Sequence, residues 1–390
     1  MVVAGSPEEG SAVAVAEHGD TEIPMISRFL KQEAVLVVSW ILAIISMFFI
    51  PPSLDYVHYV DIKVLGCLLA LMIVVAVFRK IALFDRLAYT LLRKVRTNRQ
   101  VSATLIGVTF FSSMLITNDV ALITFVPFTM VVFSMVEDEK PILPTVILQT
   151  IAANVGSSLT PMGNPQNLYM YSFYGMSQQT FFSTMLPMVG AGAVLLGVCL
   201  LAVPKGTGRF SLSLQEPQNS DVKTIVYYCV LFVLAIAGVF NIVPWYVAVG
   251  LVVVGSRKDV LKEIDYSLLL TFVGFFIFIG NLGAIESVKL FLERILATRV
   301  FLVSLGASQL ISNVPATLLL SHFTDESVQL LLGVNAGGCG TLIASLASVI
   351  SFKIFTKKYS DASGKYLLVF TVLNGLFVAL FIIVWAIFFI

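Results

Sequence analysis

Two short polar segments interrupt long apolar stretches and contain the residue types that bind small ions. The first reads ITND and places Asn118 beside Asp119, and the second reads ISNVP and contains Asn313. Amide, hydroxyl and carbonyl oxygens are ligands that small hard cations prefer. A carboxylate within an apolar segment is costly, so Asp119 is expected to bind a cation or carry a proton.

A third polar segment, TPMGNPQN at residues 160–167, also lies between apolar runs. Pro161 and Pro165 each lack the N–H that a continuous helix needs. Gly156 and Gly163 allow the backbone to approach other groups closely. The sequence therefore predicts a helix that is unwound at this point, with free backbone groups available to a ligand.

Composition indicates which kind of element must position these segments. The chain is 58% hydrophobic and 12% charged, with a mean hydropathy of +0.95, which is typical of a polytopic membrane protein. The net charge of +1 favours no nucleic-acid partner. The four cysteines lie in apolar segments without CxxC spacing, which supports neither a disulfide framework nor a metal site.

A spanning helix needs about 20 mostly apolar residues. Residues 100–136 and 300–323 instead form arms of roughly 10–16 residues around the polar tips, which favours two re-entrant hairpins. We expect an all-α polytopic membrane protein with about nine spans plus two hairpins. The candidate spans are 33–50, 60–78, 142–175 (interrupted), 181–203, 223–240, 243–256, 266–283, 326–355 (interrupted) and 365–390.

Charge predicts the orientation of these spans. Most of the 24 Lys and Arg residues fall on one side, which the positive-inside rule makes cytoplasmic. The N-terminus is then cytoplasmic and the C-terminus external, in the cell inner (plasma) membrane. Residues 1–32 are expected to form a disordered or interfacial tail, and 204–222 a cytoplasmic linker. The Lys and Arg residues expected on the external side are Lys63, Lys289, Arg294 and Arg299.

Residues 61–130 and 265–324 resemble two versions of one unit. In each, a serine precedes the tip hydroxyl by four residues, and each hairpin is followed by an interrupted span. An odd number of crossings separates the two copies, so the second is predicted to be inverted. The predicted repeats are 33–203 and 223–390. The paired residues are Ser113 and Thr117 with Ser308 and Ser312, and Asn154 opposite Asn335.

Inverted repeats with broken helices are typical of secondary transporters, which bind substrate and ions near the membrane midplane. The amphipathic stretches 80–96 and 285–298 are expected to lie in the interface as arms. No GxSxG, HExxH or paired intramembrane aspartates occur, so the sequence predicts a transporter and no enzyme. A channel is disfavoured because no span carries repeated charge.

The segments ITNDVALITFVPF, LTPMGNPQNLYMYSFYG and LISNVPATLL resemble the ion transporter superfamily, in its citrate-transporter-like branch related to divalent anion–sodium symporters and arsenite permeases. The resemblance runs from about Val35 to Ile390. It implies an elevator-like mechanism, a homodimer formed by spans 33–78 and 223–283, no cofactor and no metal beyond sodium. It also implies cation sites from Ser113, Thr117, Asn118, Asp119 and Gly163, and from Ser308, Ser312, Asn313 and Ala344.

The same resemblance implies a substrate site between the tips, formed by Asn118, Asp119, Thr160, Asn164, Pro165, Asn313, Val314, Thr341 and Ser345. The chain departs from the dicarboxylate members, whose tips read Ser-Asn-Thr twice. Here Asp119 places a carboxylate at one tip, and Val314 removes a hydroxyl at the other. This asymmetry is similar to the arsenite-permease and sodium/proton-antiporter branches.

We therefore expect transport of a small anion, a di- or tricarboxylate, coupled to sodium or protons. The alternatives are a sodium/proton antiporter or an arsenite-type oxyanion efflux permease.

Simpler structural interpretations also exist. Asn118 or Asp119 can cap a helix, TPMGNPQN can be a surface loop, and Asn335 with Gly337 and Gly338 can serve close helix packing. His322 is expected to be interfacial, and Asp61 and Asp265 to be helix caps.

Overall fold

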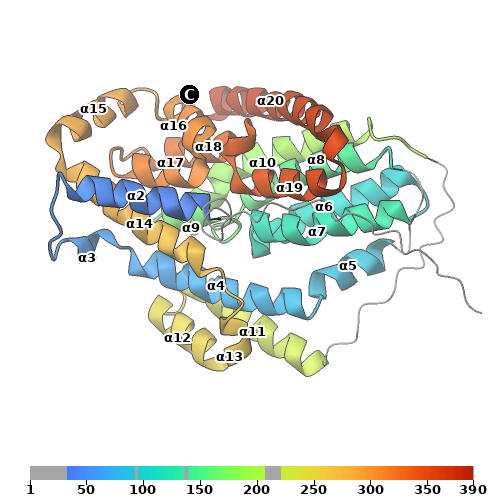
Figure 1. Ribbon diagram of the computed structural model, residues 1–390, viewed down its shortest axis with the longest axis horizontal. Helices are drawn as coiled ribbons and strands as arrows, with labels where there is room; N and C mark the ends of the chain where they lie inside the picture. Colours follow the sequence, from blue (N-terminus) through green and yellow to red (C-terminus); the bar gives the residue numbers. More distant parts are fainter. Residues whose placement is uncertain (1–32, 93–94, 136–138, 207–220, 390) are drawn as a thin grey trace, which may run out of the picture.

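The computed structural model describes residues 33–92, 95–135, 139–206 and 221–389 (Figure 1). All regular elements in these ranges are helical. The predictions for the tail at 1–32 and for most of the linker at 204–222 lie outside the described residues.

The helices of the first half are α2 (Ala34–Met47), α3 (Tyr56–Tyr59), α4 (Ile62–Lys80), α5 (Leu83–Leu92), α6 (Asn98–Ile116), α7 (Asn118–Ser134), α8 (Ile142–Ser157), α9 (Pro165–Phe173) and α10 (Gln178–Leu200). Those of the second half are α11 (Val222–Val239), α12 (Trp245–Gly255), α13 (Lys258–Leu261), α14 (Tyr266–Ala284), α15 (Glu286–Leu296), α16 (Val300–Ile311), α17 (Asn313–Ser321), α18 (Ser327–Gly338), η1 (Leu342–Ala344), α19 (Leu346–Lys358), η2 (Ser360–Ala362) and α20 (Ser363–Phe388).

Among the described residues, 6 helices are long and apolar enough to cross a membrane: α4, α6, α10, α11, α14 and the stretch Ser360–Phe388. The protein is therefore a multi-pass, all-helical membrane protein. Helices α2 and α12, which the sequence analysis counted as spans, have only 14 and 11 residues. The total of nine spans stays a prediction.

The arm lengths predicted for the first polar tip were wrong. Helix α6 has 19 residues and α7 has 17, against the roughly 10–16 expected. The predicted arm began at residue 100, because the polar residues at the start of α6 do not belong to an apolar run. Its first turn forms because the Thr97 side chain accepts a hydrogen bond from the Gln100 N–H and caps the helix. Helices α16 and α17, with 12 and 9 residues, are short.

Both predicted interruptions are present. Helix α8 ends at Ser157, and α9 begins only at Pro165, where a missing N–H costs no helical hydrogen bond. Asn164 caps α9 by accepting from the Asn167 N–H at 3.0 Å. In the second half, α18 ends at Gly338 and α19 begins after Ser345.

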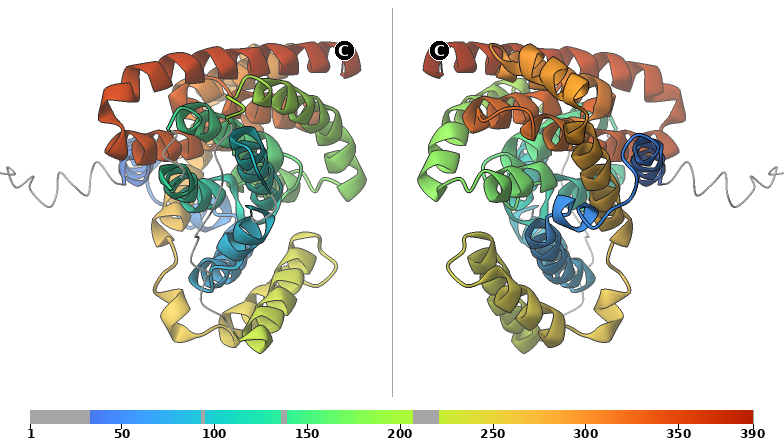
Figure 2. Two further views of the ribbon diagram at one scale, coloured as in Figure 1. Left: turned by 90° about the vertical axis from the view of Figure 1, so that its right-hand side faces the viewer. Right: turned by 90° about the vertical axis from the view of Figure 1, so that its left-hand side faces the viewer.

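The helices pack as two groups. The first, which we call the α4 group, contains α2, α4, α11, α12, α13 and α14; α2 packs on α14, and α11 and α12 pack on α4. The second, the α8 group, contains α6 to α10 and α16 to α20, with α6, α7, α10, α19 and α20 around α8. Amphipathic α5 and α15 connect the groups and lie at opposite ends of the long axis (Figure 1). Two views from opposite sides, each at right angles to Figure 1, show α11 and α12 at one edge and α20 across the other (Figure 2).

Aromatic side chains meet where the two groups touch. Tyr169 of α9 lies 5.8 Å from Phe276 of α14, and Tyr171 lies 5.7 Å from Phe240, measured between ring centroids. Between described residues of these groups, side-chain hydrogen bonds join members of the same group; for example, Asn281 of α14 donates to Ser46 of α2 at 2.9 Å. Apolar contacts have no directional requirement, so this boundary lacks the restraint that hydrogen bonds would impose.

Asp61 and Asp265 cap equivalent helices, as predicted. The Val64 N–H donates to Asp61 Oδ1 at 2.9 Å, and the Leu268 N–H donates to Asp265 Oδ1 at 3.3 Å. These bonds satisfy backbone donors at the starts of α4 and α14, which have no partner inside the helix.

Candidate functional site

A single residue separates the two helices at each polar tip. Thr117 lies between α6 and α7 with φ 70° and ψ 151°, and Ser312 lies between α16 and α17 with φ 72° and ψ 154°. This region of backbone space is nearly restricted to glycine, and other residues keep it only where their surroundings enforce it. The two tips therefore share one strained conformation, and their surroundings hold it in both.

Each tip contacts the segment that interrupts the helix following it. The Asn118 N–H donates to the Gly163 carbonyl at 3.2 Å. In the second half, Ser312 Oγ donates to the Ala344 carbonyl at 3.4 Å. The structure thus brings Asn118 to Gly163 and Ser312 to Ala344, the pairs that the sequence analysis had placed together.

Glycines allow the helices to approach just behind each tip. A methyl group at Gly156 of α8 would overlap the Phe110 carbonyl and Ser113 Oγ of α6. A methyl group at Gly337 of α18 would overlap Ser308 of α16. The two contacts are equivalent, so Gly337 has the packing role that the simpler interpretation gave it.

Threonines attach the interrupting segments to α6 and α16, the helices that precede the two tips. Thr160 Oγ1 donates to the Met114 carbonyl. Thr341 Oγ1 donates to the Gln309 carbonyl at 3.1 Å. Each carbonyl belongs to the last turn of the first hairpin helix, where backbone acceptors have no helical partner.

Two buried asparagines link the halves of the molecule. Asn154 Oδ1 accepts from Ser345 Oγ at 3.0 Å, and Asn154 Nδ2 donates to Ser348 Oγ at 3.2 Å. Asn154 Oδ1 also accepts from Asn118 Nδ2 at 3.0 Å. The first interrupted helix is therefore bonded to the start of α19 in the second half.

Asn335 makes the reciprocal connection. Its Oδ1 accepts from Asn164 Nδ2 at 3.4 Å, and its Nδ2 donates to Asn167 Oδ1 at 2.7 Å. Asn335 therefore does more than allow close packing. The sequence analysis noted that Asn154 and Asn335 occupy matching positions but did not include either in the site; that match was the signal that could have identified them.

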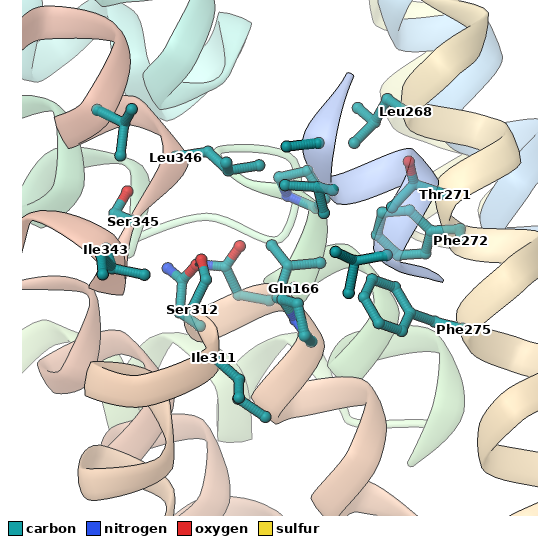
Figure 3. A pocket seen from close by; sticks show the side chains of 18 of the residues that line it. Gln166, Leu268, Thr271, Phe272, Phe275, Ile311, Ser312, Ile343, Ser345 and Leu346 are labelled. Atoms are coloured by element: carbon teal, nitrogen blue, oxygen red, sulfur yellow. The ribbon is translucent and has the colours of Figure 1, made fainter. Parts of the chain in front are cut away.

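A cavity of about 670 Å³ lies between the two groups. In Figure 3, Thr271, Phe272 and Phe275 of α14 face Ser312 and Ser345 across it. Four helices of the α8 group reach the cavity with their first residues: α7 at Asn118, α9 at Pro165, α17 at Asn313 and α19 at Leu346. Each helix start carries about half a positive charge from the helix dipole. The Asn118 and Asn167 N–H groups are already bonded, to the Gly163 carbonyl and to Asn164 Oδ1.

The charged side chains that line this cavity are Asp119 and Lys353. Asp119 is half-buried in the first turn of α7, where the helix dipole favours a carboxylate. Within the described part of the chain, no side chain donates a hydrogen bond to this carboxylate. The cavity therefore presents one carboxylate that is available to a ligand, together with several partial positive charges from helix starts.

The structure separates the predicted substrate residues into two sets. Asn118, Asp119, Pro165, Asn313, Val314 and Ser345 line the cavity. Thr160, Asn164 and Thr341 lie behind it, in the hydrogen bonds that hold the loops, and their role as substrate ligands stays a prediction. Sequence reasoning missed three polar residues of the wall, Gln166, Thr271 and Lys353. The place of Gln166 within TPMGNPQN was a signal that could have identified it, whereas nothing in the local sequence distinguishes Thr271 and Lys353.

Another cavity, of about 540 Å³, lies near the opposite end of α14 and includes Lys289 and His322. Ile279 of α14 lines both this cavity and the one described above. The His322 ring lies 4.8 Å from the Phe173 ring, between centroids. The two cavities thus follow one another along a single helix, with Ile279 between them.

The fold and cavity define a multi-pass membrane protein with a cavity between two helix groups. The chain belongs to the citrate transporter family, whose model matches residues 25–329. It is 31% identical to an uncharacterized transporter of Methanocaldococcus jannaschii, over 77% of this chain and 83% of that protein. It is 31% identical to the inner membrane protein YbiR of Escherichia coli, over 70% of this chain and 74% of that protein.

A shorter similarity, 30% identity over 37% of this chain, relates it to 29% of the silicon efflux transporter LSI3 of Oryza sativa. The chain is thus a membrane transporter and not an enzyme. The resemblance to the ion transporter superfamily is confirmed.

Proposed function

We propose that the protein is a secondary active transporter that moves a small anion coupled to sodium or protons. The observation that carries this proposal is the meeting of four helix starts at one cavity. The helix dipole makes such positions anion-binding sites. A cavity of about 670 Å³ is also within the range of small-molecule sites, which is about 300–1,000 Å³.

Bound cations would complete this anion site. Among the described residues, Lys353 is the single cationic side chain on the wall, so little positive charge would offset the repulsion between Asp119 and a di- or tricarboxylate. Cations bound at the two tips would supply the missing positive charge. The proposed ligands are Ser113, Thr117, Asn118, Asp119 and the Gly163 carbonyl in one half, and Ser308, Ser312, Asn313 and the Ala344 carbonyl in the other. Equivalent tip contacts in both halves support two such sites.

We further propose that the two halves are inverted repeats, with re-entrant hairpins α6–α7 and α16–α17. The matching hydrogen bonds of Asn154 and Asn335, and the matching backbone of Thr117 and Ser312, support a repeat. Inverted repeats place a substrate site at the midplane.

Transport would proceed by movement of the α8 group past the α4 group. All four helix starts belong to the α8 group, whereas α2 and α14 of the α4 group supply a largely apolar wall. The apolar boundary and the connecting helices α5 and α15 support an elevator-like motion. By resemblance, the α4 group would form a homodimer in the plasma membrane, with the N-terminus cytoplasmic and the C-terminus external.

A second candidate function is sodium/proton antiport or efflux of a weakly acidic oxyanion. The observation that favours it is the pair Asp119 and Val314, because a carboxylate faces the cavity where a carboxylate substrate would need a donor. A protonated or cation-bound Asp119 would accept a weak acid or exchange one ion for another. The name of the rice relative, a silicon efflux transporter, supports this alternative.

Uptake into proteoliposomes tests these proposals. Radiolabelled di- and tricarboxylates would be offered with an inward sodium gradient, an inward proton gradient or neither. The proteins would be the wild type, Asp119→Asn, and the control Asp85→Asn, which alters a first-turn carboxylate of α5 away from the cavity.

Gradient-driven uptake of one acid by the wild type and Asp85→Asn, with loss in Asp119→Asn, is the expected result. If the wild type takes up no carboxylate but releases protons when sodium is added, and Asp119→Asn does not, the anion symport proposal fails and antiport is supported.

A further inference from the structure

Asp119 also lines a second, smaller cavity. This inner pocket has a volume of about 170 Å³ and lies between α4, the α6–α7 tip and the start of α14. Its lining includes half-buried Thr117 and buried Met162, and also the exposed residues Arg79, Glu263 and Asp265. It shares Asp119, Pro165 and Leu268 with the larger cavity, so these residues lie between the two.

Size distinguishes the two cavities. At about 170 Å³ the inner pocket is below the usual range of about 300–1,000 Å³ for small-molecule sites. One water molecule occupies about 30 Å³ of liquid, so the pocket has room for roughly five waters. Its volume suits water and a small ion, whereas the larger cavity is the one within the usual range of small-molecule sites.

Charge distinguishes them as well. Asp119, Glu263 and Asp265 line the inner pocket together with Arg79, and Lys80 is bonded to Glu263 at 2.8 Å. The acidic side chains therefore exceed the basic ones by one. The larger cavity balances Asp119 against Lys353. Glu263 and Asp265 are exposed, so the pocket has acidic groups at its solvent-accessible part. An excess of carboxylates in a confined space raises the local concentration of cations.

Resting on the proposed transport function, we propose that the coupling cation, sodium or a proton, reaches Asp119 through this inner pocket and not through the substrate cavity. The pocket forms between the α4 group and the first tip, and Thr117 and Asp119 terminate it. Glu263 would attract the cation at the entrance. Substrate and cation would thus approach the same carboxylate from different sides.

Thiol labelling tests the route without knowledge of the substrate. The native cysteines would be replaced, and single cysteines introduced as Ala76→Cys in the inner pocket or Thr271→Cys in the larger cavity. Membrane-impermeant methanethiosulfonates, one cationic and one anionic, would be applied to vesicles of both orientations. The measured quantity is the ratio of cationic to anionic reaction rates.

We expect Ala76→Cys to react from one membrane side and about ten-fold faster with the cationic reagent, because the carboxylates attract it. Adding Glu263→Gln or Asp119→Asn should reduce that preference several-fold. Asp259→Asn is the matched control. Lys80 is bonded both to Glu263, at 2.8 Å, and to Asp259, at 3.1 Å, but only Glu263 lines the pocket. Asp259→Asn should therefore leave the preference unchanged.

Equal rates for the two reagents at Ala76→Cys, no reaction from either side, or an equal preference at Thr271→Cys would each overturn the proposal. These outcomes are independent of uptake. A wild type that transports nothing, while the labelling shows the expected preference, would refute the proposed function and leave a cation-selective pocket at Asp119.

Discussion

Asn154 and Asn335 show how single residues hold the centre of this protein. Each is buried on an interrupted helix of one half and bonded to the helix start of the other half. A buried amide that loses its partner costs more than the bond itself contributes, because the group stays unsatisfied. The paired asparagines therefore fix the relative position of the four helix starts around the cavity.

Double-mutant cycles should detect this arrangement. The pair Asn154→Ala with Ser345→Ala and the pair Asn335→Ala with Asn164→Ala should each give a coupling of about 0.5–1.5 kcal/mol in the free energy of unfolding. The measurement is unfolding in detergent. The control pair is Ser345→Ala with Thr90→Ala, which removes a local bond on α5 and should be additive. Additivity in both asparagine cycles would contradict the role given to these residues.

At the scale of elements, close helix contact behind each tip depends on glycine. Gly156 brings α8 onto α6, and Gly337 brings α18 onto α16. These contacts support the strained backbone of Thr117 and Ser312, since such conformations persist only where packing enforces them. The tips are therefore set by the helices behind them and not by their own sequence.

Gly156→Ala and Gly337→Ala should each destabilise the protein by about 1–3 kcal/mol, because the added methyl group overlaps atoms that cannot move freely. Gly107→Ala is the matched control on α6, where a methyl group meets nothing within 4 Å. It should be neutral, or stabilising by up to about 1 kcal/mol through helix propensity. Thermal unfolding of the purified variants measures both effects. Equal behaviour of Gly107→Ala and Gly156→Ala would be inconsistent with the close contact.

At the scale of the whole molecule, the main feature is where polar contacts lie relative to the boundary between the two helix groups. Hydrogen bonds between described side chains hold each helix group together, whereas aromatic rings meet at the boundary between groups. An apolar boundary allows sliding at low cost, because within the described ranges no side-chain hydrogen bond between the groups must break. The proposed elevator motion requires this property.

A covalent link across the boundary should stop transport. In a chain without its native cysteines, Tyr171→Cys with Phe240→Cys, joined by a short bifunctional maleimide, should abolish uptake. Thr150→Cys with Ser351→Cys, whose native hydroxyls lie 2.6 Å apart within the α8 group, is the control and should keep uptake after an oxidant links it. Full activity of the linked Tyr171–Phe240 variant would rule out the motion.

Much of the architecture was determined by the sequence alone. Apolar run lengths determine spanning helices, and prolines at 161 and 165 determine a break, because these effects depend only on neighbouring residues. The asparagine tips and the matching serines were visible for the same reason. The length of α6 was not visible in the sequence, because a polar first turn capped by Thr97 does not appear as part of an apolar run.

Only the tertiary structure decided which residues meet. It placed Thr160, Asn164 and Thr341 in the supporting hydrogen bonds, added Gln166, Thr271 and Lys353 to the cavity, and joined Asp119 to a second pocket with Glu263. These residues are distant along the chain and come together only when helix groups pack. Periodicity and spacing report local geometry, whereas a binding site depends on contacts between segments that the local pattern does not specify.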